Sequence, residues 1–301
     1  MIHKNVLNLV GNTPIVKINK LTGENDATVL AKLEEYNIGG SIKSVMALYM
    51  IESAEKSGKL TGDKIIIEAS SGNTGIAMAI IAAVKGYKIT IIIPESVSIE
   101  RRKLIKTYGA ELILSPGEKG TDGATEIKKE LIAESPEKYA DLDQFKNPAN
   151  ALAHYNITGK EIITQTEGKV DVVILGIGTA GTGVGVSKCL KEYNPKIEII
   201  GVMPEIGAKI QGLRNSEELM QTGLFQNNAF DKIIKIKKEE VPKTFTISKM
   251  LAQKEGILAG MSSGAAMFIA LQKARELGKN KTIAVILPDS GERYLSTDLF
   301  E

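Results

Sequence analysis

The chain has 301 residues and a formal net charge of +2, from 38 basic and 36 acidic residues. A charge so close to zero argues against a nucleic-acid-binding protein, which usually has a basic excess on one face. No run of about 18 apolar residues occurs, so no membrane span is expected. The length exceeds what one simple core usually supports and suits two packed domains.

The cysteine count and the N-terminal residues bear on location. The only cysteine, Cys189, cannot form an internal disulfide, which favours a reducing compartment. The first residues lack the apolar core and the small-residue cleavage site of a secretory signal. We therefore expect a cytoplasmic protein.

Short β-branched runs alternate with longer helical patterns along the chain. Strands are predicted at 28–33, 64–68, 88–93, 111–114, 170–175, 198–203 and 282–287. Several lack polar alternation, which is typical of strands buried on both faces of a mainly parallel sheet. A helix is predicted from Gly75 to Lys85, with Gly86 as its C-cap. The pattern predicts an α/β fold built from right-handed βαβ units.

The alternation occurs twice, around 40–115 and around 157–290. A polar stretch between them, 139–150, is predicted to be irregular. We expect a boundary between two domains near this stretch.

Two junctions between a predicted strand and helix are rich in small residues. The first contains Ser70, Ser71, Asn73 and Thr74 together with Gly72 and Gly75. Backbone N–H groups at a helix start attract a carboxylate or phosphate, and these side chains add donors. An ordinary helix N-cap with turn residues explains the same pattern.

The second junction, residues 176–183, matches the dinucleotide fingerprint G-x-G-x-x-G. Glu205, after the next predicted strand, has a suitable place for the acidic residue that binds the ribose. An NAD-dependent dehydrogenase is therefore a competing hypothesis. The two threonines and additional glycines of this loop also suit a single phosphate group.

Lys43 lies at the first turn of a predicted amphipathic helix. The helix dipole disfavours a positive charge there, which would lower the pKa of the amine and raise its nucleophilicity. Five of the 38 basic residues are arginines, so 33 are lysines. An ordinary surface lysine is accordingly the alternative interpretation.

Six segments in order along nearly the whole chain resemble the cysteine synthase (O-acetylserine sulfhydrylase) family. They are residues 10–14, 39–43, 71–75, 144–155, 176–179 and 288–296. The resemblance implies a pyridoxal-phosphate enzyme of fold type II, similar to the tryptophan synthase β subunit. Its two three-layer α/β domains would have mainly parallel sheets and hold the cofactor between them. The smaller, mobile domain would be residues 38–148, and the larger would be 1–37 plus 149–301.

The resemblance also implies residue roles. Lys43 would bind the cofactor covalently and move the substrate's α-proton, while Asn73 would bind the ring hydroxyl and Ser262 would face the pyridine nitrogen. The phosphate would be held by Gly178, Thr179, Ala180, Gly181 and Thr182. The substrate α-carboxylate would be held by Ser70, Ser71, Thr74 and Gln144. His3 and His154 are the only histidines, so no multi-histidine metal site is expected.

The sequence departs from the family pattern at several places. Ala180 stands where glycine is common. The stretch from Lys209 begins like the common type, but 212–218 resembles the B-type cysteine synthases and the members that use O-phosphoserine. In these proteins an arginine faces the mouth of the site. Arg214 is thus a candidate for binding an anionic substrate group, although a surface arginine in a loop is the alternative.

The expected reaction is β-replacement: O-acetylserine or O-phosphoserine plus sulfide gives L-cysteine. The principal alternative consumes L-cysteine and releases hydrogen sulfide, giving lanthionine, cystathionine or serine. The family resemblance also implies a homodimer. Its other partners would be small amino acids and sulfide or a thiol, with no nucleic acid, membrane or metal ion.

Overall fold

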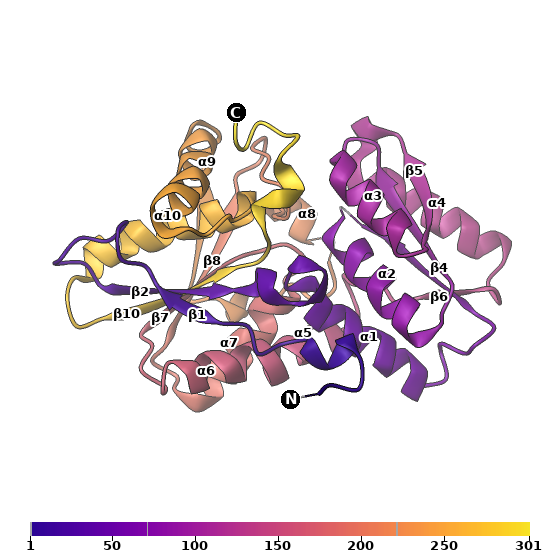
Figure 1. The fold of residues 1–301 in the computed structure, drawn as a ribbon, viewed down its shortest axis with the longest axis horizontal. Helices are drawn as coiled ribbons and strands as arrows, with labels where there is room; N and C mark the ends of the chain where they lie inside the picture. Colours follow the sequence, from indigo (N-terminus) through magenta and orange to yellow (C-terminus); the bar gives the residue numbers. More distant parts are fainter. Residues whose placement is uncertain (1, 71, 221) are drawn as a thin grey trace.

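The computed structural model describes residues 2–70, 72–220 and 222–301. Within them, the strands form two separate sheets (Figure 1). The large sheet has the order β1 (Ile15–Lys17), β2 (Thr28–Leu33), β10 (Thr282–Leu287), β7 (Val172–Gly176), β8 (Glu198–Pro204) and β9 (Lys232–Ile236). The small sheet has the order β5 (Glu111–Ser115), β4 (Ile89–Pro94), β3 (Ile65–Ala69) and β6 (Tyr139–Asp141). Only the pairing of β1 with β2 is antiparallel among these strands.

Helices cover both faces of each sheet. The small sheet packs against α1 (Lys43–Lys56), α2 (Asn73–Lys85) and α3 (Ile99–Thr107) on one face and α4 (Gly120–Glu134) on the other. The large sheet packs against α9 (Val241–Met250) and α10 (Met261–Leu277) on one face, and α6 (Lys160–Gln165) and α7 (Gly181–Tyr193) on the other. Two further helices are α5 (Pro148–His154) and α8 (Ser216–Met220). The prediction of an α/β fold is confirmed, and each sheet with the helices on its two faces makes three layers.

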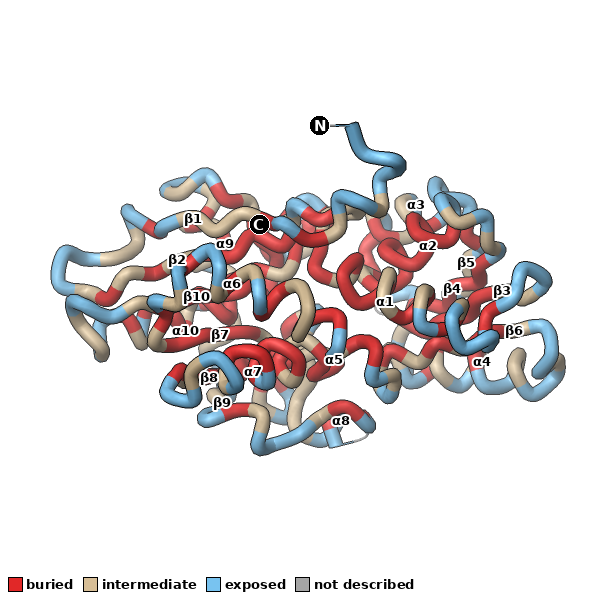
Figure 2. Tube along the Cα trace, turned by 90° about the horizontal axis from the view of Figure 1, so that it is seen from below, coloured by how far each residue is buried: buried red, intermediate tan, exposed pale blue. Residues whose placement is uncertain are grey.

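Central strands alternate their side chains between two buried faces. Ile66 contributes to the core under α1 and α2, while Ile67 contributes to the core under α4. Val172 and Val173 divide in the same way between the two faces of the large sheet. Figure 2 shows this buried trace along the strands, with exposed residues at the periphery. Because neither face meets water, these strands lack the polar alternation of a half-exposed strand.

The seven predicted strands all form, but the sequence analysis missed β1, β6 and β9. Two of these have only three residues, and all three lie at sheet edges. The stretch 139–150, predicted as irregular, begins with β6 and ends in α5. The boundary between domains near this stretch stays a prediction.

One helix prediction is confirmed. The helix predicted from Gly75 is α2, which begins two residues earlier and ends at Lys85, with Gly86 as its left-handed C-cap (φ 80°). Cys189 is buried within α7. Among the described helices, none is long and apolar enough to cross a membrane.

Candidate active site

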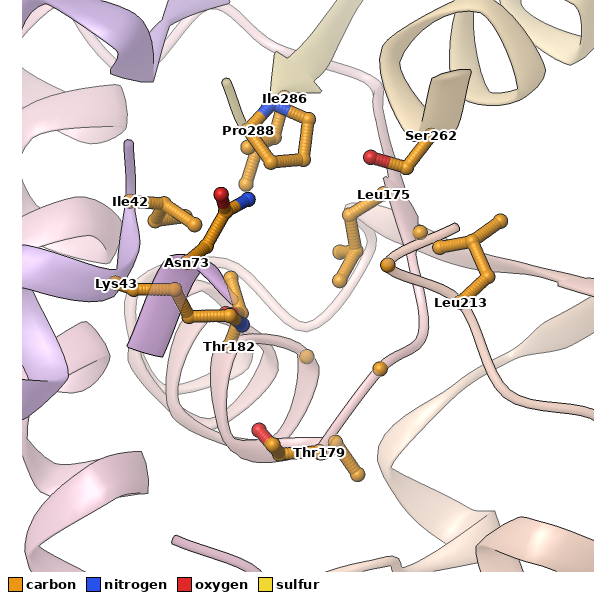
Figure 3. Close-up of a pocket in the computed structure, with 15 residues that line it drawn as sticks. Ile42, Lys43, Asn73, Leu175, Thr179, Thr182, Leu213, Ser262, Ile286 and Pro288 are labelled. Atoms are coloured by element: carbon orange, nitrogen blue, oxygen red, sulfur yellow. The ribbon is translucent and has the colours of Figure 1, made fainter. Parts of the chain in front are cut away.

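A pocket lies at the carboxyl ends of β7 and β10. The first residues of α1, α2, α7 and α10 also reach it, so several helix N-termini meet at one place. Ligands of parallel α/β sheets bind at such an edge. The lining residues are Ile42, Lys43, Asn73, Leu175, Gly176, Gly178, Thr179, Ala180, Thr182, Gly183, Gly212, Leu213, Ser262, Ile286 and Pro288 (Figure 3).

Lys43 is the first residue of α1 and reaches the pocket from a loop with two left-handed glycines, Gly39 and Gly40. The backbone N–H of Ile42 donates to the Pro288 carbonyl at 2.9 Å, which ties this loop to the segment after β10. Burial lowers the pKa of Lys43 from 10.5 to about 8, against the opposing attraction of Asp289. The pKa is lowered, as the sequence predicted. The largest cause is desolvation by burial, whereas the sequence argument relied on the helix dipole.

The loop between β7 and α7, together with the first turn of α7, forms another part of the pocket wall. Gly178, Thr179, Ala180 and Thr182 line the pocket. Thr182 belongs to the first turn of α7, where backbone N–H groups lack partners within the helix. Gly181 does not line the pocket but packs against α5. This part of the chain therefore offers hydroxyl and amide donors to an anion.

Asn73, the first residue of α2, has its side-chain amide fixed at both ends. Its Nδ2 donates to Asp289 Oδ2 at 2.6 Å, and Arg293 Nη1 donates to its Oδ1 at 2.6 Å. The hydroxyl of Tyr294 donates to the same Asp289 oxygen at 2.7 Å, and Arg101 Nη2 lies 4.0 Å from it. The sequence analysis quoted the segment 288–296 only as a motif and missed this role.

Ser262 lies in the first turn of α10, 3% exposed, and its hydroxyl points into the pocket (Figure 3). Its neighbours across the pocket include Gly212, whose missing Cβ would lie 3.4 Å from Ser262 Oγ. A neutral hydroxyl is thus the polar group that α10 presents to the pocket.

Of the residues predicted to bind a carboxylate, Ser70, Thr74 and Gln144 do not line this pocket. Ser70, Thr74 and Gln144 are buried, and Thr74 Oγ1 donates to Gln144 Oε1 at 2.7 Å. Ser70 Oγ accepts the N–H groups of Gly72 and Gly75 at 3.0 and 3.2 Å. Ser71 lies outside the described residues.

Arg214 also lies next to the pocket wall, directly after the lining residue Leu213. Its guanidinium stacks 4.2 Å from the centre of the Phe145 ring, and its backbone N–H donates to the Ile177 carbonyl at 3.0 Å. Burial lowers the pKa of Arg214, while Glu218 raises it. The side chain is therefore a half-buried cation that stacks on Phe145.

Glu205 takes no part in this pocket. Its Oε1 accepts the backbone N–H of Lys238 at 2.7 Å, at the edge of the large sheet. Lys43 and Ser262 have no function in the NAD-dependent dehydrogenase hypothesis. In the described part of the chain, no group of three or more histidine, cysteine or acidic residues could hold a metal ion.

The fold and pocket define a class of enzyme. Residues 6–289 match the family model of pyridoxal-phosphate dependent enzymes, and the chain belongs to that family. The dehydrogenase hypothesis is thereby replaced, and the cofactor is pyridoxal phosphate.

Particular relatives narrow the comparison. The chain is 44% identical over 304 residues to a cysteine synthase of Staphylococcus aureus (strain Mu50), covering 98% of this chain and 96% of the relative. A hydrogen sulfide-producing enzyme of Fusobacterium nucleatum has a similar structure, with a TM-score of 0.91, 40% identity and coverage of 98% and 100%. An O-ureido-L-serine synthase has a TM-score of 0.93, 34% identity and coverage of 100% and 96%.

Proposed function

We propose that this chain is a cysteine synthase that replaces the β-substituent of O-acetylserine or O-phosphoserine with sulfide, giving L-cysteine. One observation carries the proposal: Lys43, with its pKa lowered to about 8, shares a pocket with the donor-rich loop before α7. The cysteine synthase relative, 44% identical over nearly the full chain, supports the same activity.

The donors in the pocket fit pyridoxal phosphate. An aldehyde needs a primary amine, and Lys43 is the one amine among the lining residues. Thr179, Thr182 and the first turn of α7 would hold the phosphate, with Gly178, Ala180 and Gly181 keeping the loop close. Ser262 would face the ring nitrogen and Asn73 the ring hydroxyl. When bound, the cofactor supplies an electron sink for negative charge at the substrate's Cα.

Lys43 would also move the reacting proton. Once the substrate's amino group has displaced it from the cofactor, the neutral Nζ removes the proton from Cα, and the β-substituent then leaves with its bonding electrons. After sulfide adds at Cβ, the ammonium returns a proton to Cα. A pKa of about 8 suits both directions, because each protonation state is accessible near neutral pH.

Binding of the substrate carboxylate would require a rearrangement. We assign this role to Ser70, Thr74 and Gln144, with Ser71 as a further expected member. In the structure, Thr74 and Gln144 bond to one another, and Gln144 Nε2 also donates to the Ala69 carbonyl at 3.1 Å. These groups must exchange partners to reach a ligand. We also propose, from the family resemblance, that the smaller domain, residues 38–148, moves on substrate binding.

A product assay tests the proposal. Purified protein loaded with cofactor is given O-acetylserine plus sulfide, O-phosphoserine plus sulfide, or L-cysteine alone. We expect L-cysteine from at least one serine derivative, at a rate above that of sulfide release from L-cysteine. The Lys43→Ala variant serves as the inactive control. A loaded wild-type protein that turns over none of these substrates would contradict the proposal.

The second candidate function is release of hydrogen sulfide from L-cysteine, with cysteine, homocysteine or water adding at Cβ. The likeness to the hydrogen sulfide-producing enzyme favours it. The same residues serve both reactions, since the substrates differ only in the group that leaves. Faster sulfide release from L-cysteine alone than synthesis from either serine derivative would select this candidate.

Arg214 is our candidate for recognition of an anionic substrate group, such as the phosphate of O-phosphoserine. We expect Arg214→Ala to lower kcat/KM for O-phosphoserine about tenfold or more, because a charge-assisted hydrogen bond contributes roughly 1.5–3 kcal/mol. The value for O-acetylserine should change little. Arg275→Ala, at an exposed position on α10, is the matched control. Equal losses with both donors would contradict the assignment.

The oligomeric state and location are proposed on the family resemblance. We propose a cytoplasmic homodimer whose other partners are small molecules, with no nucleic acid or membrane. Exposed apolar side chains, Val6, Leu9 and Leu152, are compatible with a subunit contact. Light scattering of the purified protein measures the mass of the particle, and a monomer would contradict the dimer.

A further inference from the structure

The short helix α5 presents two polar residues to the start of α7, one to the preceding loop and one to the first turn. Asn150 and His154, one helical turn apart, are both 0% exposed. The helices α5 and α7 approach closely because Gly181 and Gly185 have no side chains. A Cβ at Gly181 would lie 2.0 Å from Asn150 Oδ1, and one at Gly185 would lie 2.1 Å from the Ala151 carbonyl oxygen.

Asn150 donates to the hydroxyl oxygen of Thr179. Its Nδ2 donates to the Gln144 carbonyl at 2.8 Å and to Thr179 Oγ1 at 3.1 Å. Because a backbone carbonyl can only accept, Gln144 fixes the amide with its NH2 group on this side. Thr179 Oγ1 is therefore an acceptor toward Asn150, and its own proton is free to point into the pocket.

His154 has a similar place behind Thr182. Its Nε2 lies 3.2 Å from Thr182 Oγ1, and its Nδ1 lies 3.0 Å from Thr158 Oγ1. Burial, together with the nearby charge of Lys43, lowers the pKa of His154 to about 3. The imidazole is thus neutral at ordinary pH, with one nitrogen protonated and the other an acceptor.

The pocket has few charges with which to hold a phosphate. Lys43 is the only cation among its fifteen lining residues, and the proposed function commits that amine to the aldehyde. Hydroxyl and backbone N–H donors remain for the phosphate. The direction of each threonine proton therefore decides whether the hydroxyl attracts the anion or repels it.

We propose that Asn150 and His154 are positioning residues that direct the hydroxyl protons of Thr179 and Thr182 toward the cofactor phosphate. The inference rests on the proposed function, which puts the phosphate in this loop. For Thr182 it requires one direction of donation: Thr158 O–H to His154 Nδ1, His154 Nε2–H to Thr182 Oγ1, and Thr182 O–H into the pocket. The Nε2 tautomer of His154 follows from this order.

The experiment compares two ligands on apoprotein: pyridoxal phosphate, and pyridoxal, which lacks the phosphate. Dissociation constants are measured by absorbance for wild type, Asn150→Ala, His154→Leu and His154→Gln. We expect the first two variants to bind pyridoxal phosphate about tenfold or more weakly, with pyridoxal affinity unchanged. Glutamine retains a donor near the place of Nε2, so His154→Gln should recover most of the loss.

A matched control and a second readout separate positioning from packing. Asn147→Ala removes a side chain of the same type from the N-cap of α5, where Oδ1 accepts the Ala149 N–H at 3.0 Å. The Asn147→Ala variant should leave the ratio of the affinities for pyridoxal phosphate and pyridoxal unchanged. The phosphorus NMR shift of the bound phosphate should move in Asn150→Ala and His154→Leu, and not in Asn147→Ala.

Two results would overturn the inference. Equal losses for both ligands, or unchanged phosphate-ester binding in the Asn150 and His154 variants, would do so while leaving the proposed function intact. A wild-type apoprotein that binds neither compound would instead overturn the proposed function, and this inference with it.

Discussion

Ala180 has a left-handed backbone conformation, φ 69° and ψ −15°, at the N-cap of α7. A Cβ in this region costs roughly 1–2 kcal/mol, partly offset because glycine makes the unfolded chain more flexible. We expect Ala180→Gly to raise the free energy of unfolding by about 1 kcal/mol, measured by urea denaturation. Ala133→Gly, in an exposed helical position of α4, should instead be destabilising. A less stable Ala180→Gly protein would contradict the strain at this residue.

The lowered pKa of Lys43 predicts how cofactor capture depends on pH. Only the neutral amine attacks an aldehyde, and the pKa falls from 10.5 to about 8. The rate of pyridoxal phosphate uptake by apoprotein should therefore rise with pH and level off above about pH 8 to 9. Nα-acetyl-lysine under the same conditions corrects for ionisation of the cofactor. A rate that keeps rising toward about pH 10.5, as for an ordinary lysine, would refute the assignment.

The sequence analysis named residues that line the pocket but missed the partners of Asn73. Lys43, Asn73 and Ser262, whose roles the family resemblance implied, all line one pocket. The hydrogen bond from Asn73 to Asp289 joins residues 216 positions apart in the sequence. No local spacing predicts such a contact, because it depends on how the two sheets pack together.

The same division holds for secondary structure elements. Buried central strands can be predicted from their apolar runs, and all seven predicted strands form. The edge strand β9 has exposed lysines at 232 and 235, which interrupt the run of apolar residues by which the buried strands were predicted. β6 is three residues long, and its place in the small sheet depends on its pairing with β3. Length and edge position, rather than unusual residues, explain what the patterns missed.

Close packing of α5 on α7 yields a prediction for these two helices. A Cβ at Gly185 would lie 2.1 Å from the Ala151 carbonyl oxygen and 2.8 Å from the Tyr155 nitrogen, both backbone atoms. Gly185→Ala must therefore separate the helices, and we expect a loss of roughly 2–3 kcal/mol in unfolding free energy, together with weaker cofactor binding. Gly62→Ala, whose Cβ meets nothing within 4 Å, should change stability little. Equal stability of the two variants would contradict this packing.

At the scale of the whole molecule, a buried cluster joins the N-terminal segment to the chain entering α1. Glu34 accepts hydrogen bonds from Thr13 (3.1 Å) and from Asn37 (2.7 Å). Burial raises the pKa of Glu34 from 4.5 to about 7, although Lys32 lowers it, and nearby Glu161 raises it further. The folded protein thus retains a proton that the unfolded chain has lost, so this group reduces stability as pH rises from 4.5 to about 7.

Glu34→Gln mimics the protonated carboxyl at every pH. The difference in unfolding free energy, variant minus wild type, should increase as pH rises through this window and stay constant above it. Urea denaturation at several pH values measures it. Gln165→Ala removes a neutral contact of Lys32 (2.9 Å) in the same cluster and should give a difference independent of pH. A flat difference for Glu34→Gln would show that its carboxyl titrates normally.

The position of β10 has a consequence for synthesis of the protein. β2 pairs only with β1 and β10 among the described strands, and β10 lies between it and β7. β1 and β2, which leave the ribosome first, therefore cannot join the rest of the large sheet until residues 282–287 have been synthesised. The small sheet, within 65–141, is complete much earlier. A nascent chain can thus fold its smaller sheet during translation, but it gains its cofactor pocket only near the end of synthesis.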